Sequence, residues 1–177
     1  MNDQRPIALV GYRGTGKTTV AQILARQLEW DWVDADVEVE LRTGKSIAAI
    51  FADEGESTFR DLESQVVTDL CTRQRTVLAL GGGAILRETN RENIATCQEV
   101  VWLQASADVL AERIAQDVAT AGRRPNLTNH DGRTEIELLL AERDPFYRTC
   151  ATLEVDTEYK EPAEIAGEIF AAVNAVG

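Results

Sequence analysis

The 177-residue chain carries 30 acidic and 18 basic side chains, which gives a net charge of −12, and 44% of its residues are hydrophobic. This hydrophobic share excludes an intrinsically disordered chain, and the length predicts a single domain over residues 1–177. So acidic a chain repels nucleic acid and anionic membranes, and we therefore expect neither as a partner. No apolar run reaches the roughly 20 residues that a membrane-spanning helix needs.

Cysteine usage and the start of the chain both bear on the cellular compartment. Cys71, Cys97 and Cys150 are odd in number and widely spaced, which favours free thiols in a reducing compartment over a disulfide framework. The polar residues before Ile7 lead straight into an apolar run and lack the character of a signal peptide. We therefore expect a cytoplasmic protein.

The first predicted element is a buried strand over residues 7–10, and the sequence GYRGTGKTT follows at residues 11–19. A helix comes next, because apolar residues recur at helical spacing over residues 20–28. This order is the context of a phosphate-binding loop, in which backbone N–H groups hold the phosphates. Lys17 would reach the β- and γ-phosphates, and Thr18 would ligate Mg²⁺. The alternative is a chance glycine turn that caps a helix, and the flanking elements argue against it.

A second short strand is predicted over residues 32–36, and it ends in Asp34 and Asp36. On an extended strand both carboxylates would point the same way, and together they could hold Mg²⁺ through water and orient an attacking hydroxyl. The alternative is that these acids begin the next helix, where they would complement its dipole. The neighbouring phosphate loop favours the functional interpretation. Residues 37–41 alternate like a strand but include good helix formers, so the sequence leaves that piece open.

Helical segments are predicted over residues 47–52 and from about residue 57 to residue 71. The second segment places Phe59 beside Arg60, and Glu63 could hold this arginine from three positions further on. Arginine binds a carboxylate through two parallel hydrogen bonds, which lysine cannot do. From these residues alone, however, a solvated helix face is the favoured interpretation.

A buried strand over residues 76–80 stops at the triplet Gly81-Gly82-Gly83. Three glycines allow the backbone to approach a ligand closely, although an ordinary sharp turn can look the same. The rest of the chain alternates between helices and strands. The remaining predictions are a helix near residues 87–95, a strand over 100–103, a helix capped by Ser106, a helical pattern at 136–140, a strand over 153–155 and a final helix from Pro162.

The stretch from residue 120 to residue 133 is polar, and it contains the string RRPNL at residues 123–127. Long loops inside compact domains are either functional lids or disordered. A lid that delivers an arginine would neutralise charge on a transferring phosphoryl group and exclude water. Arg143, near the end of the helix that follows, would be unremarkable alone.

Buried strands that alternate with helices predict an α/β sandwich around a parallel sheet. Ligands of such folds bind outside the carboxyl ends of the strands. Three polar clusters fall at those ends, namely the loop at residues 11–19, the Asp34/Asp36 pair and the glycines at residues 81–83. We therefore predict that the three clusters form one active site.

Together these segments make the chain resemble the shikimate kinase family from Ile7 to about Asp156. The matching strings, in order, are GYRGTGKTT, VDADVEVELRTGKSIAAIF, EGESTFRDLE, LALGGGA, RRPNL and LLAERDPFY. The phosphate loop alone is shared with many NTPases, whereas the ordered series is far more specific. The resemblance implies phosphorylation of the 3-hydroxyl of shikimate by ATP, with one Mg²⁺ ion, in chorismate and aromatic amino-acid biosynthesis.

On the nucleotide side, the resemblance implies that the loop backbone and Lys17 hold the phosphates, with Thr18 on Mg²⁺ and Asp34 supporting the ion through water. Arg124 would be a lid arginine that contacts phosphate, and Arg113 resembles an arginine that stacks on adenine. The implied nucleotide-binding residues are Gly14, Thr15, Gly16, Lys17, Thr18, Thr19, Arg113 and Arg124.

On the acceptor side, the resemblance implies that Asp36 binds and orients the hydroxyl that is phosphorylated. Two arginines would grip the carboxylate together with the backbone of the glycine triplet, and two phenylalanines would wall the pocket. These residues are Arg60, Arg143, Gly81, Gly82, Gly83, Phe51 and Phe59. The implied catalytic residues are Lys17, Asp36 and Arg124.

The resemblance also implies a P-loop NTPase fold of the nucleoside monophosphate kinase type, acting as a monomer. This fold is a three-layer sandwich around a five-stranded parallel sheet of order 2-3-1-4-5, with an acceptor-binding region at about 36–63 and a mobile lid at about 117–134. One alternative is another small hydroxy-acid kinase, such as a gluconate kinase. A second is a non-catalytic nucleotide-binding module, which the combined metal ligands and acceptor clamp argue against.

Overall fold

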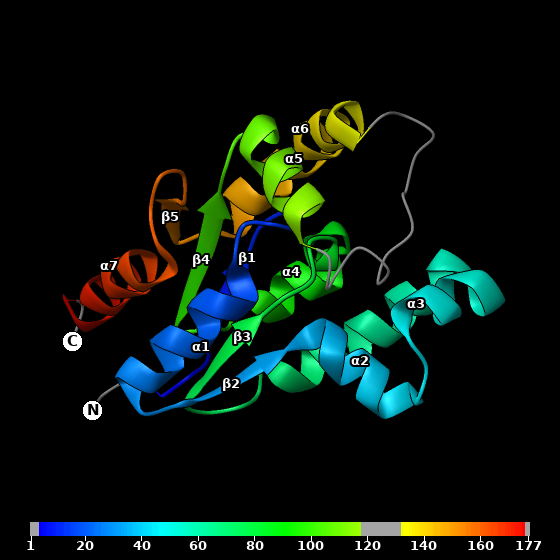
Figure 1. The fold of residues 1–177 in the computed structure, drawn as a ribbon. Coiled ribbons are helices and arrows are strands. Elements are labelled where there is room, and N and C mark those ends of the chain that lie inside the picture. The colour runs from blue at the N-terminus through cyan, green and yellow to red at the C-terminus, as the bar shows by residue number, and fades with distance from the viewer. Residues whose placement is uncertain (1–3, 118–131, 176–177) are drawn as a thin grey trace.

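The computed structural model describes residues 4–117 and 132–175, and its central element is a β-sheet (Figure 1). Five strands form this sheet in the order β2-β3-β1-β4-β5, and every neighbouring pair is parallel. The predicted five-stranded parallel sheet of order 2-3-1-4-5 is therefore confirmed. The strands are β1 (Ile7–Val10), β2 (Asp31–Asp34), β3 (Thr76–Ala79), β4 (Glu99–Gln104) and β5 (Leu153–Asp156).

Helices connect consecutive strands, because a parallel neighbour can be reached only by a crossover connection. Their bounds agree closely with the predicted helical segments after β1, β3 and β4. The helices are α1 (Lys17–Leu28), α2 (Ala35–Thr43), α3 (Ile47–Leu70), the short 3₁₀ turn η1 (Ala84–Leu86), α4 (Glu88–Ile94), α5 (Ala107–Gln116), α6 (Gly132–Cys150) and α7 (Pro162–Ala175).

Each face of the sheet is covered by its own set of helices. In β1, Ile7 and Leu9 belong to a core cluster with residues of α1 and α7. Ala8 and Val10, which point to the opposite face, belong to a second cluster with residues of α2, α3, α4 and α6. Because side chains alternate along an extended strand, this division produces the three-layer α/β sandwich that was predicted (Figure 1).

The chain leaves β2 earlier than the sequence suggested. Strand β2 ends at Asp34, and the residues that follow, including the ambiguous piece at 37–41, form α2. Oδ1 of Asp34 accepts hydrogen bonds from the backbone N–H groups of Asp36 (2.9 Å) and Val37 (3.3 Å). Such an N-cap satisfies donors that a helix start leaves unpaired, which favours a helix here. The prediction that Asp34 and Asp36 share an extended strand is therefore wrong.

The two helical segments expected between residues 47 and 71 are joined in one element, α3. A kink at Gly55, whose φ of 84° and ψ of 170° are not helical, separates the two parts. Glycine adopts a positive φ without the steric penalty of a side chain, which explains why the bend falls there. The second part of α3 then runs along the sheet and buries Val66, Val67 and Leu70.

The three cysteines are free, as predicted. Within the described residues, no helix combines the length and the apolar character needed to cross a membrane. The predicted lid at about 117–134 lies outside the described residues except at Asp117 and at residues 132–134, which begin α6, and Arg124 lies outside them as well.

Candidate active site

Glycines shape the loop between β1 and α1. Gly16 has a φ of 89° and forms the N-cap of α1, with no side chain capping the N–H groups of the first turn. Gly11 has a φ of 140°, and a Cβ there would lie 2.5 Å from the carbonyl oxygen of Leu103. The loop thus presents uncapped N–H groups at the positive end of a helix, which is a favourable site for an anion.

The side chains of Thr15 and Lys17 bond to carbonyl oxygens within the loop, whereas the side chain of Thr19 faces solvent. Thr15 is buried, and its Oγ1 donates to the carbonyl oxygen of Tyr12 at 2.8 Å, so its backbone is the part suited to bind phosphate. Nζ of Lys17 donates to the carbonyl oxygens of Gly11 (2.7 Å) and Tyr12 (2.8 Å), which holds the ammonium group within the loop. Thr19 is exposed on α1.

A hydrogen bond connects the phosphate-binding loop to the end of β2. Oγ1 of Thr18 donates to Oδ2 of Asp34 at 2.6 Å. Because the hydroxyl proton is directed at the carboxylate, the oxygen of Thr18 keeps lone pairs for a cation. A hydroxyl and a carboxylate are the hard oxygen ligands that Mg²⁺ prefers, so these residues fit the ion. Among the described residues no group of three His, Cys, Asp or Glu side chains is placed to hold a metal, so water and phosphate oxygens would supply the other ligands.

Asp36 lies in the first turn of α2 and is half-buried. Its backbone N–H donates to Asp34, and Asp34 in turn accepts from Thr18. The position of Asp36 is therefore tied to the phosphate-binding loop through two hydrogen bonds. Although these acids do not share a strand, the cap at Asp34 keeps both carboxylates at the carboxyl end of β2.

The glycine turn after β3 brings two arginines together. A Cβ on Gly82 would lie 3.5 Å from Nη1 of Arg143 and 3.5 Å from the carbonyl oxygen of Gly11 in the phosphate-binding loop. A Cβ on Gly83 would lie 2.7 Å from Cζ of Arg60, with both Nη atoms nearer still. Because the two glycines are adjacent, the guanidinium groups of Arg60 and Arg143 flank the same turn. The structure therefore shows close packing of the glycines against these arginines, and the predicted approach of the backbone to a ligand stays a prediction.

Arg60 is 7% exposed, so the solvated-face interpretation of this residue is wrong. Its Nη1 donates to Oε2 of the buried Glu63 at 2.7 Å, and its Nη2 donates to Oε1 of Glu56 at 3.2 Å. The prediction that Glu63 holds this arginine is confirmed. Periodicity within the helix could not reveal the burial, because the turn that covers Arg60 comes from Gly83 in a distant part of the chain.

Arg143 projects from α6 and is 5% exposed. Its Cζ lies 5.7 Å from the centroid of the Tyr12 ring, a cation–π distance. The Nε atoms of Arg60 and Arg143 are buried, and neither has a hydrogen-bond partner within residues 4–117 and 132–175. A buried donor without a hydrogen-bond partner costs folding free energy, so a ligand that accepts from it would be favoured. A planar guanidinium group matches a carboxylate through two parallel hydrogen bonds. The two arginines therefore suit an acidic ligand.

The family model described as shikimate kinase matches residues 13–174 of this chain. A shikimate kinase of Rhodopirellula baltica is 45% identical over 170 residues, which cover 96% of this chain and 91% of that protein. The chain belongs to the shikimate kinase family. Its structure is similar to that of the shikimate kinase from Acinetobacter baumannii in complex with shikimate, with a TM-score of 0.92, 35% identity, and coverage of 99% of this chain and 96% of that one.

A gluconokinase from Sinorhizobium meliloti also has a similar structure. The TM-score is 0.65 and the identity is 19%, over 99% of this chain and 95% of that one. At this identity the likeness shows a shared fold alone. Shikimate kinase family membership, by contrast, is shown by sequence over nearly the whole chain, which confirms the resemblance carried by the six strings.

In this member of the shikimate kinase family, Arg113 joins three elements. The residue extends from α5, and its Nη1 contacts Oγ1 of Thr157 (2.9 Å) and the carbonyl oxygen of Gly14 (3.4 Å). Its Nη2 donates to the carbonyl oxygen of Thr157 at 2.9 Å. The guanidinium group is therefore anchored between the phosphate-binding loop and the segment after β5. A planar group fixed beside this loop could support an adenine ring.

The two predicted pocket-wall phenylalanines lie in contact. The ring centroids of Phe51 and Phe59 are 4.8 Å apart. Phe59 is fully buried, and Cζ of Arg60 lies 5.3 Å from the centroid of its ring, whereas Phe51 is half-buried. Of the two rings, Phe51 is therefore the better placed to contact a ligand. The buried ring of Phe59 packs against the guanidinium group of Arg60.

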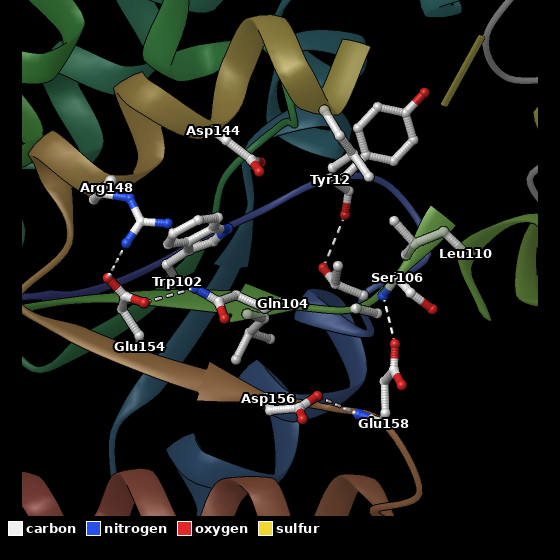
Figure 2. A pocket seen from close by; sticks show the side chains of 14 residues that line it. Tyr12, Trp102, Gln104, Ser106, Leu110, Asp144, Arg148, Glu154, Asp156 and Glu158 are labelled. Carbon is white, nitrogen blue, oxygen red and sulfur yellow. Dashed lines mark hydrogen bonds and ion pairs between the residues drawn. The ribbon is translucent and has the colours of Figure 1, made fainter. Parts of the chain in front are cut away.

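A cavity of about 400 Å³ lies beside the phosphate-binding loop, between the ends of β4 and β5 and the helices α5 and α6 (Figure 2). Its wall is polar and includes several acids. The lining residues include Tyr12, Trp102, Ser106, Asp144, Arg148 and Glu158. Tyr12 and Thr15 of the phosphate-binding loop line this cavity, whereas Lys17, Asp36, Arg60 and Arg143 do not.

Two buried residues of the site escaped sequence reasoning. Thr157 is fully buried and anchors Arg113. Tyr147, also fully buried, donates from its hydroxyl to the carbonyl oxygen of Gly82 at 2.5 Å. Tyr147 lies four positions after Arg143, so helical spacing could have placed it on the same face. No signal in the sequence marks Thr157.

Proposed function

We propose that this protein transfers the terminal phosphoryl group of ATP to the 3-hydroxyl of shikimate. One arrangement carries the proposal: the turn at Gly82 and Gly83 meets the phosphate-binding loop on one side and two buried guanidinium groups on the other. A phosphate donor and a small carboxylic acid would meet at this turn. The shikimate kinase family, to which the chain belongs, supports the choice of acceptor.

The nucleotide would bind along the loop from Gly14 to Thr19. The uncapped N–H groups of the first turn of α1 would receive the phosphates, and the ammonium group of Lys17 would move from the loop carbonyls to the β- and γ-phosphate oxygens. Thr18 and, through water, Asp34 would hold Mg²⁺, which when bound neutralises phosphate charge. Arg113 would support the adenine, and Arg124 would reach the phosphates from the segment that follows α5.

The acceptor would bind with its carboxylate between Arg60 and Arg143, next to the backbone of the glycine triplet. Asp36 would accept a hydrogen bond from the 3-hydroxyl and direct its oxygen at the phosphoryl group. Phosphoryl transfer has a loose transition state, so positioning matters more than early removal of the proton. We therefore assign Asp36 chiefly an orienting role. We also propose that the enzyme is a monomer that acts in the cytoplasm.

A coupled assay of ADP release with Mg·ATP, with and without shikimate, tests this proposal directly. We expect ADP release that depends on shikimate and forms one shikimate 3-phosphate per ADP. A panel with gluconate and quinate separates the proposed acceptor from other hydroxy acids. A preference for gluconate would overturn the choice of acceptor, and tight ATP binding without any phosphorylated product would overturn catalysis itself.

A further inference from the structure

Tyr147 is a fully buried residue of α6 that the proposed chemistry does not use. Its hydroxyl donates to the carbonyl oxygen of Gly82 at 2.5 Å. The bond joins α6 to the glycine turn, two segments that are 65 residues apart in the sequence. Arg143 precedes Tyr147 by one helical turn, so the same face of α6 supplies both a guanidinium group and a fixed hydroxyl to this turn.

The ring of Tyr147 is held rigidly in the core. It stacks on Trp102 of β4, with ring centroids 5.6 Å apart and an interplanar angle of 24°. Burial raises the pKa of Tyr147 well above its ordinary value, while the charge of Arg143 acts in the opposite direction. The phenol therefore keeps its proton at neutral pH. A ring fixed by packing presents its O–H at a fixed point in space.

The bond acts on the peptide between Gly82 and Gly83. A trans peptide is planar, so the N–H of Gly83 points opposite to the carbonyl of Gly82. Holding this carbonyl toward α6 therefore fixes the direction of that N–H. A peptide between two glycines rotates with little steric hindrance, because neither residue has a Cβ to limit it. The backbone bond from Ala84 N–H to the carbonyl oxygen of Gly81 (3.0 Å) closes this turn, and the bond from Tyr147 adds the restraint on the Gly82 carbonyl itself.

The turn has close neighbours on both sides. A Cβ on Gly82 would lie 3.5 Å from Nη1 of Arg143 and from the carbonyl oxygen of Gly11. Arg60 fills the space beside Gly83. Rotation of this peptide would therefore change the surface between the two guanidinium groups, which is where the acceptor carboxylate is proposed to bind. The phosphate-binding loop would be affected less, because the loop atoms nearest to Gly82 belong to Gly11 and Arg13, which precede the proposed phosphate-binding stretch from Gly14 to Thr19.

We propose that Tyr147 is a positioning residue that locks the Gly82–Gly83 peptide and thereby sets the affinity of the acceptor site, an inference that rests on the proposed function. Tyr147 would act through the turn that the acceptor contacts, and its hydroxyl also shares a hydrogen bond with Arg143 on the same side of that turn. Its loss should weaken the binding of shikimate and leave the binding of ATP nearly unchanged.

The test is the variant Tyr147→Phe, which keeps the ring and removes only the hydroxyl. We expect KM for shikimate to rise by about five- to thirtyfold, because a buried carbonyl loses its partner, while KM for ATP changes by less than about twofold. Calorimetric titration of shikimate in the absence of nucleotide should give the same factor in Kd. KM does not depend on the active fraction of a preparation, so a partly unfolded variant still gives an answer.

The matched control is Tyr159→Phe, which removes the same hydroxyl from a ring that is 96% exposed. It should leave KM for shikimate unchanged. The inference is overturned if Tyr147→Phe leaves KM for shikimate within twofold, if KM for shikimate and KM for ATP rise together, or if Tyr159→Phe raises KM for shikimate equally. Failure of the wild type to phosphorylate shikimate would instead reject the proposed function.

Discussion

The guanidinium group of Arg60 occupies the space that a side chain on Gly83 would need. Its Cζ lies 2.7 Å from the position of a Cβ on that glycine, whereas carbon atoms that are not bonded approach to about 3.5 Å. Arg60 cannot move away freely, because Glu63 and Glu56 hold two of its nitrogens. Position 83 therefore needs a glycine, because Arg60 fills the space that a side chain there would occupy.

We expect Gly83→Ala to displace Arg60 and to raise KM for shikimate by roughly tenfold or more, since hydrogen bonds to charged groups contribute about 1.5–3 kcal/mol each. Steady-state kinetics with shikimate as the varied substrate measure the effect. Gly167→Ala in α7 is the matched control, because a Cβ there meets nothing within 4 Å. Equal KM values in the two variants would contradict the assignment of Arg60.

Replacing Arg60 with lysine keeps the charge and removes the paired hydrogen-bond geometry. We expect Arg60→Lys to raise KM for shikimate by about tenfold, with KM for ATP unchanged. Arg42→Lys is the control, because Arg42 forms exposed ion pairs with Glu38 and Asp69 away from the proposed acceptor site. An unaltered KM for shikimate in Arg60→Lys would count against a carboxylate clamp.

Asp36 is proposed to orient the acceptor hydroxyl. We expect Asp36→Asn to lower kcat by roughly 10²–10⁴-fold, which is the usual contribution of such a group, while ATP still binds. Single-turnover kinetics and nucleotide titration separate the two effects. Asp69→Asn, on an exposed part of α3, should behave like the wild type. Near-normal turnover of Asp36→Asn would remove Asp36 from the site.

Asp34 has two roles that one substitution can separate. Asparagine caps a helix about as well as aspartate does, so Asp34→Asn should keep α2 intact. The lost charge should raise the Mg²⁺ concentration for half-maximal activity by roughly 10–100-fold, the effect expected of an outer-sphere ligand. Asp34→Ala should also lose about 1 kcal/mol of stability. A Mg²⁺ dependence like that of the wild type would show that Asp34 is only a cap.

Asp144 points from α6 into the cavity of Figure 2, and burial raises the pKa of its carboxyl, with the charge of Arg148 acting in the opposite direction. A raised pKa means that folding favours the protonated form. The contribution of this group to stability is therefore present at acid pH and is lost as the pH rises through the folded-state pKa.

We accordingly expect Asp144→Asn to be more stable than the wild type at pH 7. The difference should shrink as the pH falls through the folded-state pKa toward the ordinary aspartate pKa of about 3.9, because the buried carboxyl then takes up a proton and no longer carries a charge. Urea denaturation at pH 7 and pH 4 measures the difference. The exposed Asp53→Asn is the control. A gain that is as large at pH 4 as at pH 7 would refute the role of ionisation.

The sequence alone determined the phosphate-binding loop, the parallel sheet and the free thiols. These features are local or periodic: a strand, glycines and a lysine within thirteen residues define the loop, and apolar runs that alternate with helices define the sheet. The strings that resemble the shikimate kinase family also lie in continuous segments. Such patterns can be recognised without knowing which segments touch.

Tertiary structure alone decided the state of the arginines and the end of β2. Arg60 looked solvated because the turn that buries it is formed by Gly83, beyond the helix that carries the arginine. Helical spacing could place Tyr147 on the face of Arg143, but it could not reveal that the hydroxyl bonds to the backbone carbonyl of Gly82. Burial and hydrogen bonding between distant segments depend on how the layers pack, and no periodicity within one segment encodes them.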